Sequence, residues 1–206
     1  MRTAFRIQRP SARREELLNG LVEIFLAEGF TGFSVEDLAV RLQCSKTTLY
    51  AVAPSKEQLI TAVVRAFFRR STERIEARLA AEADPVGRIG VYLDSIAAEL
   101  APASPAFYND LDSFAPARDI YAQNTALAAR RVRELVRDAE RPARPVDAVF
   151  IGAVAAKVIE SIQQGQLRAL TSLDDAAAYR SLADLIVAGV IGTPRPRSSR
   201  QPSHTN

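Results

Sequence analysis

The chain has few of the side chains on which metal sites, disulfide bonds and many active sites depend. It contains one cysteine, Cys44, and its one histidine, His204, lies close to the C-terminal end. A single cysteine cannot form an internal disulfide bond, and no Cys/His cluster has the spacing of metal ligands. The sequence therefore predicts no metal site and no cofactor. Cys44 lies between Leu42 and Leu49, and we expect it to fill a small buried apolar position rather than to act as a redox sensor.

Long apolar runs and catalytic motifs are missing as well. The longest apolar run, residues 148–156, is far too short to span a bilayer, and the basic N-terminus lacks the apolar segment of a signal peptide. We therefore expect a cytoplasmic protein. No glycine-rich phosphate loop occurs, and helical spacing places Asp110 and Asp112 on different faces of one helix. A helical enzyme is accordingly the least favoured class.

Two short helices joined by a tight turn are predicted in the first third of the chain. Ser34 and Asp37 have the spacing of a capping box, in which a hydroxyl group accepts a hydrogen bond from an amide of the first helical turn. Ser55 and Gln58 repeat that spacing, so helices should begin near residues 35 and 56. The first helix has an apolar face that can be buried, formed by Val35, Leu38, Ala39 and Leu42.

The second short helix is predicted to follow Ser45, which is placed to cap it. Leu49 points inward, whereas the first helical residues carry an ammonium group and two hydroxyl groups: Lys46, Thr47 and Thr48. Such a helix is too short to be stable alone, so packing must hold it with its start outward. A recognition helix meets base edges in the major groove in this way, and Ser, Thr and Lys side chains can bind base edges or phosphates.

These segments resemble the tetracycline-repressor (TetR) family of transcription regulators. The similarity begins with RREELLNGLVEIFLAEGF and the break at Gly29-Phe30, continues through SKTTLY, and ends in PSKEQL. These pieces occur together at the right spacing and cover roughly a quarter of the chain. The resemblance implies an all-α fold with an N-terminal three-helix helix-turn-helix DNA-binding domain, followed by a helical ligand-binding and dimerisation domain. The residues implied to bind DNA are Ser34, Ser45, Lys46, Thr47, Thr48, Tyr50 and Lys56.

Two positions depart from the family pattern. Gln43 stands in the turn where the family usually has glycine, and residues 51–53 are Ala-Val-Ala where the family usually has aromatic side chains. Gln43 must therefore adopt the backbone conformation that glycine normally permits. A phosphate contact from a polar residue after Tyr50 does not carry over to Ala51.

Positive charge gathers at the two ends of the chain. Residues 1–14 contain five arginines and residues 193–206 contain three, with no acidic residue in either segment. Without those eight of the 27 basic residues, the segment between the two ends has 19 basic and 24 acidic residues. An arginine-rich arm can lie along phosphates or enter a minor groove, and a solubilising arm is the alternative. The C-terminal segment is rich in Pro, Ser and Arg, and we expect it to be disordered.

Helical periodicity dominates after residue 58, and no alternating strand pattern of useful length appears. An apolar stripe predicts a long helix from about Lys56 to about Ala81, which in the family links the DNA-binding domain to the body. Asp84-Pro85 and Ser104-Pro105 each place a capping residue before a proline at the first helical position, which marks two further helix starts. Another helix is predicted from about Pro116 to Ala139.

The last two predicted helices span about residues 146–165 and 174–191. Both mix small and large apolar residues, which permits close packing of helices, and Ser172 is expected to cap the second, with Asp175 three positions on. The resemblance implies that these helices pair with their copies in a second subunit as a four-helix bundle. The internal core of a monomer is the alternative. We favour the homodimer, because a symmetric regulator needs two heads to span the half-sites of a palindrome.

A small-molecule pocket is expected between the DNA-binding domain and the last two helices. Family members usually enclose such a pocket, and prolines at positions 102, 105 and 116 divide this region into short helices. Aromatic residues at helical spacing are more often core than pocket, so each candidate has both interpretations. The candidate lining residues are Tyr92, Phe107, Tyr108, Phe114, Tyr121 and Asn124.

The sequence thus predicts four segments: a basic arm (1–12), a helix-turn-helix domain (13–55), a helical ligand-binding and dimerisation domain (56–192) and a basic tail (193–206). The function predicted is a homodimeric, sequence-specific DNA-binding regulator, most simply a repressor released from a palindromic operator by a small molecule. Activation stays open, because the effect of a bound protein depends on where its site lies relative to the promoter. A nonspecific architectural DNA-binding protein is the main alternative.

Overall fold

The computed structural model describes residues 10–139 and 147–191, and every regular element in these two ranges is an α-helix. The predicted all-α fold is thereby confirmed. None of these helices is both long and apolar enough to cross a membrane. They are α1 (Pro10–Glu28), α2 (Val35–Arg41), α3 (Lys46–Tyr50), α4 (Lys56–Ala80), α5 (Pro85–Leu100), α6 (Pro105–Ser113), α7 (Ala115–Asp138), α8 (Ala148–Gln163), α9 (Gln166–Thr171) and α10 (Asp175–Ile191).

Local capping residues set where these helices begin. The Ser34 hydroxyl accepts a hydrogen bond from the Asp37 amide, and the Asp37 carboxylate accepts one from the Ser34 amide, so the capping box of α2 is complete. Ser45 and Ser55 cap α3 and α4 through their hydroxyl groups. Before α5 and α6, Asp84 and Ser104 cap helices whose first residue is proline. Five predicted helix starts are therefore confirmed.

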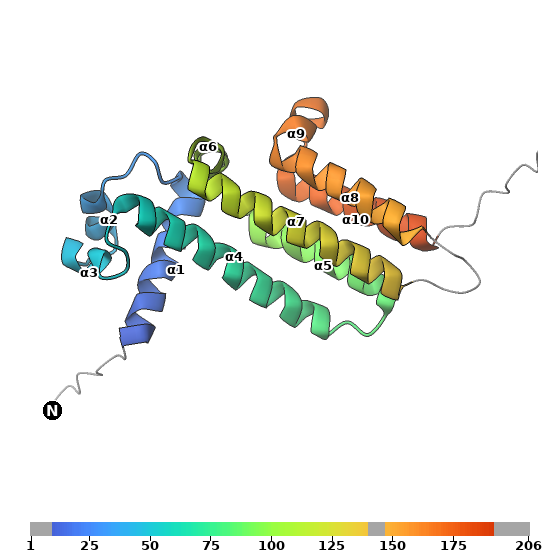
Figure 1. Ribbon diagram of the computed structural model, residues 1–206, viewed down its shortest axis with the longest axis horizontal. Coiled ribbons are helices and arrows are strands. Elements are labelled where there is room, and N and C mark those ends of the chain that lie inside the picture. Colours follow the sequence, from blue (N-terminus) through green and yellow to red (C-terminus); the bar gives the residue numbers. More distant parts are fainter. Residues whose placement is uncertain (1–9, 140–146, 192–206) are drawn as a thin grey trace, which may run out of the picture.

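The helices form a small head and an elongated body (Figure 1). Helices α1, α2 and α3 form the head at one end, and α4 runs from the head along the body. Helix α5 packs against α4 and α7 within the body, while α6 lies between the body and α1. The C-terminal helices complete the body, because α10 packs along α5 and α8 packs along α7.

The core of the head is built on α1. Leu21 and Phe25 of this helix are fully buried, as are Leu38 of α2 and Leu49 of α3. Burying a leucine side chain contributes about 1.5–3 kcal/mol, which exceeds what a five-residue helix can gain from its own hydrogen bonds. Leu49 is therefore the anchor that holds α3 on the head.

Two details at the C-terminal end differ from the sequence prediction. A short helix, α9, was not predicted, and Ser172 does not cap α10 but ends α9 in a left-handed conformation at φ +61°. Asp174 performs the capping, because its Oδ1 atom accepts a hydrogen bond of 2.7 Å from the Ala177 amide. Asp and Ser are both good caps, so spacing alone did not separate the two. Val146 and the basic segments 1–9 and 193–206 lie outside the described residues.

The turn between α2 and α3 has the backbone conformation of a glycine. Gln43 has a φ of +50°, in the left-handed region that side chains with a Cβ atom seldom occupy. The turn closes all the same, because the Cys44 amide donates to the Ala39 carbonyl at 3.0 Å. Gln43 thus adopts the conformation that the family pattern required of it.

We expect Gln43→Gly to stabilise the protein by about 0.5–1 kcal/mol. Glycine removes the cost of the left-handed backbone, about 1–2 kcal/mol. Part of this stabilisation is offset because glycine increases the conformational entropy of the unfolded chain. Urea unfolding followed by circular dichroism measures the difference. Gln164→Gly is the matched control, because Gln164 ends α8 at φ −82° and should gain nothing. Equal effects at both positions would contradict a strained backbone at Gln43.

Candidate DNA-binding surface and ligand cavity

Helix α3 presents its polar side chains to solvent from the surface of the head. The Ser45 hydroxyl accepts a hydrogen bond of 3.1 Å from the Thr48 amide, and Leu49 holds the opposite side of the helix in the core. Lys46, Thr47 and Tyr50 are exposed, and Tyr50 keeps 47% of its surface accessible. The head therefore offers a short, rigid and polar helix face of the kind that enters a major groove.

The predicted DNA-binding residues differ in how free their polar groups are. The Thr47 hydroxyl has no hydrogen-bond partner in the part of the chain that the structure describes, whereas the half-buried Thr48 hydroxyl lies 2.8 Å from that of Ser45. Lys46 forms an ion pair with Glu36 of α2, and this hydrogen bond raises the pKa of the lysine and lowers that of the glutamate. Glu36 thus already balances the charge of Lys46. Thr47 is consequently the residue of α3 best placed to read a base.

Two other predicted residues have structural contacts. Ser34 caps α2 and also donates its hydroxyl hydrogen to Asp37 at 2.7 Å. The half-buried Lys56 donates from its ammonium group to the Thr31 carbonyl at 2.9 Å. Ser34 and Lys56 therefore support the loop between α1 and α2, and any contact with DNA would be additional to that role.

A body residue that was not among the predicted sites holds the same loop. Asp110 of α6 accepts hydrogen bonds from the backbone amides of Phe30 and Thr31, the second at 2.9 Å, and from the Thr31 hydroxyl. Gly29 makes this approach possible, because its φ is +78° and a Cβ atom there would lie 2.5 Å from Asp110 Oδ2. Nothing in the spacing of the sequence indicated this contact, since the partners are about 80 residues apart.

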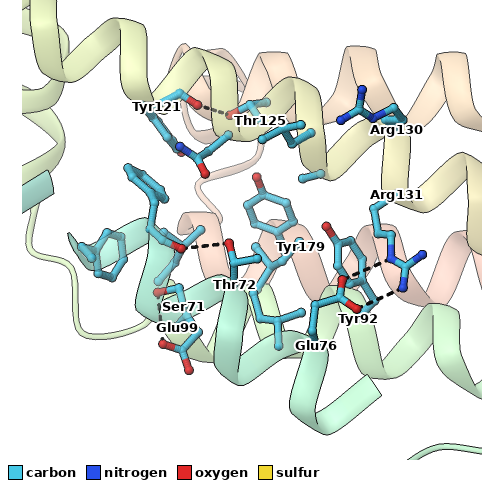
Figure 2. A pocket seen from close by; sticks show the side chains of 18 of the residues that line it. Ser71, Thr72, Glu76, Tyr92, Glu99, Tyr121, Thr125, Arg130, Arg131 and Tyr179 are labelled. Carbon is cyan, nitrogen blue, oxygen red and sulfur yellow. Dashed lines mark hydrogen bonds and ion pairs between the residues drawn. The ribbon is translucent and has the colours of Figure 1, made fainter. Parts of the chain in front are cut away.

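The body contains a cavity of about 310 Å³ between α4, α5 and α7, closed on one side by Tyr179 of α10 (Figure 2). Its walls combine aromatic rings with a few polar groups, as is usual for small-molecule sites. The rings of Phe68 and Tyr121 stack with their centres 5.7 Å apart. The aromatic lining residues are Phe67, Phe68, Tyr92, Tyr121 and Tyr179.

Two carboxylates on the cavity wall are already paired with arginine. Figure 2 shows the ion pair of Glu76 with Arg131 beside Tyr92, and the two groups approach to 3.0 Å. Glu99 is buried and accepts hydrogen bonds of 3.2 Å from both Ser71 and Arg74. A ligand therefore meets charges that already have partners at these two places.

The tyrosine hydroxyl groups are the neutral polar elements of the cavity. Burial is the main cause that raises the pKa of Tyr92, Tyr121 and Tyr179 above the ordinary value for tyrosine. All three therefore stay protonated at neutral pH and act as hydrogen-bonding groups. The Tyr121 hydroxyl is buried and has no hydrogen-bond partner among the described residues.

The six predicted lining residues divide into two groups. Tyr92, Tyr121 and Asn124 line the cavity. The other three lie outside the lining, in aromatic contacts that reach toward the head: Phe107, Tyr108 and Phe114. Sequence reasoning missed the α4 wall, including Glu76, and also Glu99 of α5, because a helical stripe does not reveal which part of it borders a void.

Comparison with known proteins gives one family and one fold. Residues 17–63 match the family model described as bacterial regulatory proteins, tetR family. No curated protein matched the sequence.

Solved structures resemble the chain over most of its length. One is a proposed transcriptional regulator from Saccharomonospora viridis in complex with choline, with 18% identity, a TM-score of 0.64, and coverage of 86% of this chain and 96% of that one. A TetR-family transcriptional regulator from Thermus thermophilus has 21% identity, a TM-score of 0.57, and coverage of 84% and 97%. Another from Streptomyces coelicolor has 18% identity, a TM-score of 0.62, and coverage of 88% of each chain.

The family match covers α1 to α3 and the beginning of α4, which is where the exposed polar face of α3 and its anchor Leu49 lie. Residues 17–63 thus resemble bacterial regulatory proteins of the tetR family, and head and body together share the fold of solved TetR-family transcriptional regulators.

Proposed function

We infer that the protein is a homodimeric regulator that binds a palindromic operator through α3 and leaves it when a small molecule occupies the body cavity. The observation that carries this proposal is the exposed polar face of α3, anchored by the fully buried Leu49. This function places the protein in the cytoplasm, with the DNA. Repression is its simplest form, since a bound dimer blocks whatever promoter its site overlaps.

Thr47 makes the main contact with the DNA bases in this proposal. Its hydroxyl can bond a base edge, and its methyl group can contact a thymine methyl. Tyr50, exposed at the end of α3, binds a phosphate in this proposal, and the Ser34 hydroxyl does so after releasing Asp37. Lys46 exchanges its ion pair with Glu36 for a guanine or a phosphate, so its contribution includes the cost of breaking that pair.

Dimerisation is supported by an apolar surface on the last helices. Val149 and Phe150 of α8 are 68% and 65% exposed, and Leu185 of α10 is 64% exposed. Large exposed apolar residues gathered on neighbouring helices are typical of an interface. In a two-fold dimer the same surface serves both subunits, and α8 and α10 would form a four-helix bundle with their copies.

Effector control is supported by the cavity and by the course of α4. Its first turns, with Leu59, Ile60 and Val63, belong to the core near the head, while Phe67 and Ile75 farther along line the cavity. A ligand that binds more tightly to a conformation whose heads do not match the operator spacing shifts the population toward that conformation. DNA affinity then falls by the same factor by which DNA weakens ligand binding. The neighbour solved with choline supports a small molecule as the class of effector.

We expect Thr47→Ala to weaken specific binding by about tenfold or more, because the base contact disappears while the phosphate contacts stay. The measurement is fluorescence anisotropy on DNA from just upstream of the gene and its neighbours, at fixed salt with excess unrelated competitor. A random-sequence selection supplies the operator if those fragments do not bind.

Thr171→Ala on α9 is the control for this variant, because Thr171 is exposed and far from α3 in the fold. It should leave DNA binding unchanged. Wild-type binding that is steeply salt-dependent and removed by any competitor would instead identify a nonspecific architectural protein.

Phe150→Glu should convert dimers to monomers, because it places a charge on the apolar face of α8 without disturbing a buried site. Sedimentation velocity across a range of concentrations should show the dimer dissociation constant rise at least tenfold. Leu127→Glu on α7 is the control, since Leu127 is also exposed but lies outside α8 and α10. Dimers of unchanged affinity would contradict the proposed interface.

Compounds that raise the melting temperature by binding the cavity should weaken operator binding at least tenfold, which corresponds to about 1.4 kcal/mol of coupling. Ala128→Trp, which fills the cavity wall, should abolish their binding, and Ala122→Trp on the exposed face of α7 should not. A screen in which every tight binder leaves DNA affinity unchanged would count against effector control.

A further inference from the structure

We propose that α6 is a bracket between the head and the C-terminal helices, and that Asp110 is a positioning residue that fixes the spacing of the two DNA-binding heads. This inference rests on the proposed function for its consequence at the operator. The contacts that carry it belong to a single subunit and do not depend on which ligand fills the cavity.

The first side of the bracket is the Asp110 carboxylate. Its Oδ2 atom accepts both backbone amides, those of Phe30 and Thr31, and its Oδ1 atom accepts the Thr31 hydroxyl. A carboxylate that accepts several hydrogen bonds forms stronger interactions than a neutral acceptor does. From the other direction, Lys56 of α4 bonds the Thr31 carbonyl. The loop between α1 and α2 is therefore clamped between α4 and α6.

Apolar contacts reinforce the same joint. The ring of Phe107 on α6 lies 6.2 Å from Phe30 and 5.9 Å from Phe67, edge to face in both cases. At the start of α6, the Ser104 amide donates to the Leu26 carbonyl of α1 at 2.8 Å. Polar and apolar contacts thus both tie α6 to the head.

The second side of the bracket reaches the C-terminal helices. Tyr108 lies two residues before Asp110, and its ring packs under Arg168 of α9, whose guanidinium carbon lies 5.6 Å from the ring centre. Arg168 in turn binds the buried Asp175 of α10 at 3.0 Å. One short helix therefore contacts the head at Asp110 and, through Arg168, the C-terminal helices at Tyr108.

The spacing of the heads follows from this geometry. The two-fold axis of the proposed dimer lies between the copies of α8 and α10, so the bracket fixes each head relative to that axis. If Asp110 releases the loop, the head remains attached through α4 and can pivot. Adding one base pair between the half-sites increases their separation by about 3.4 Å and rotates one relative to the other by roughly 34°. A head that can pivot tolerates such a change, whereas a fixed head does not.

The experiment compares Asp110→Asn with wild type on operators lengthened or shortened by one and two base pairs between half-sites. Asparagine keeps the size of the side chain but loses its charge and one acceptor oxygen. We expect wild type to lose at least tenfold in affinity for each changed base pair and the variant to lose threefold or less. Tyr108→Leu, which removes the ring beneath Arg168, should flatten the spacing profile in the same direction but less.

Asp112→Asn is the matched control, because Asp112 lies on the same helix and its exposed side chain forms no hydrogen bond or ion pair within the described residues. Its spacing profile should match that of wild type. A merely destabilised head would lower affinity equally at every spacing. An unchanged profile for Asp110→Asn, or a flattened one for Asp112→Asn, would overturn the proposal.

Amide hydrogen exchange of the free full-length protein tests the bracket without DNA. In Asp110→Asn the amides of Phe30 and Thr31 should exchange at least tenfold faster, while the buried turns of α1 keep their protection. Uniformly faster exchange throughout the head, or unchanged exchange at both amides, would overturn the bracket. If wild type bound no paired half-sites at all, the proposed function would fail, whereas the exchange result would still decide the role of Asp110.

Discussion

The 25-residue helix α4 runs from the head into the body, and the rest of the structure depends on this continuous helix. Its N-terminal turns pack with α1 in the head, and its later turns border the cavity with α5 and α7. A continuous helix resists bending because each turn is held by backbone hydrogen bonds. A displacement of α4 at the cavity therefore reaches the head. The proposed effector control needs this connection.

Helix α3 also depends on packing against the rest of the head. With five residues, α3 gains too little from its own hydrogen bonds to persist alone, so Leu49 and the turn at Gln43 must hold it. The strained backbone at Gln43 and the ion pair of Lys46 with Glu36 both involve α3 or its turn. The burial of Leu49 thus offsets the cost of the strained backbone at Gln43, which lies next to the exposed face of α3.

Polar contacts inside the body are placed where helices meet rather than scattered through the core. Asp110 joins α6 to the head, Asp175 joins α10 to α9, and Glu99 joins α5 to α4. Each of these carboxylates has a charged or amide partner, which offsets its desolvation. Such contacts require one particular alignment of helices, whereas apolar packing tolerates small slips. They are therefore well suited to fix how the body holds the head.

The sequence by itself determined the helix starts and the exposed polar face of α3, because a cap or an apolar stripe involves residues within three or four positions of each other. Ser34, Ser45 and Leu49 were predictable for this reason, and so was the conformation of Gln43 once the family pattern was recognised. Only the tertiary structure decided which aromatic residues border a cavity and that Asp110 binds the loop at Thr31. Those relations join residues on different helices, about 80 positions apart in the case of Asp110, and the packing of whole helices brings them together.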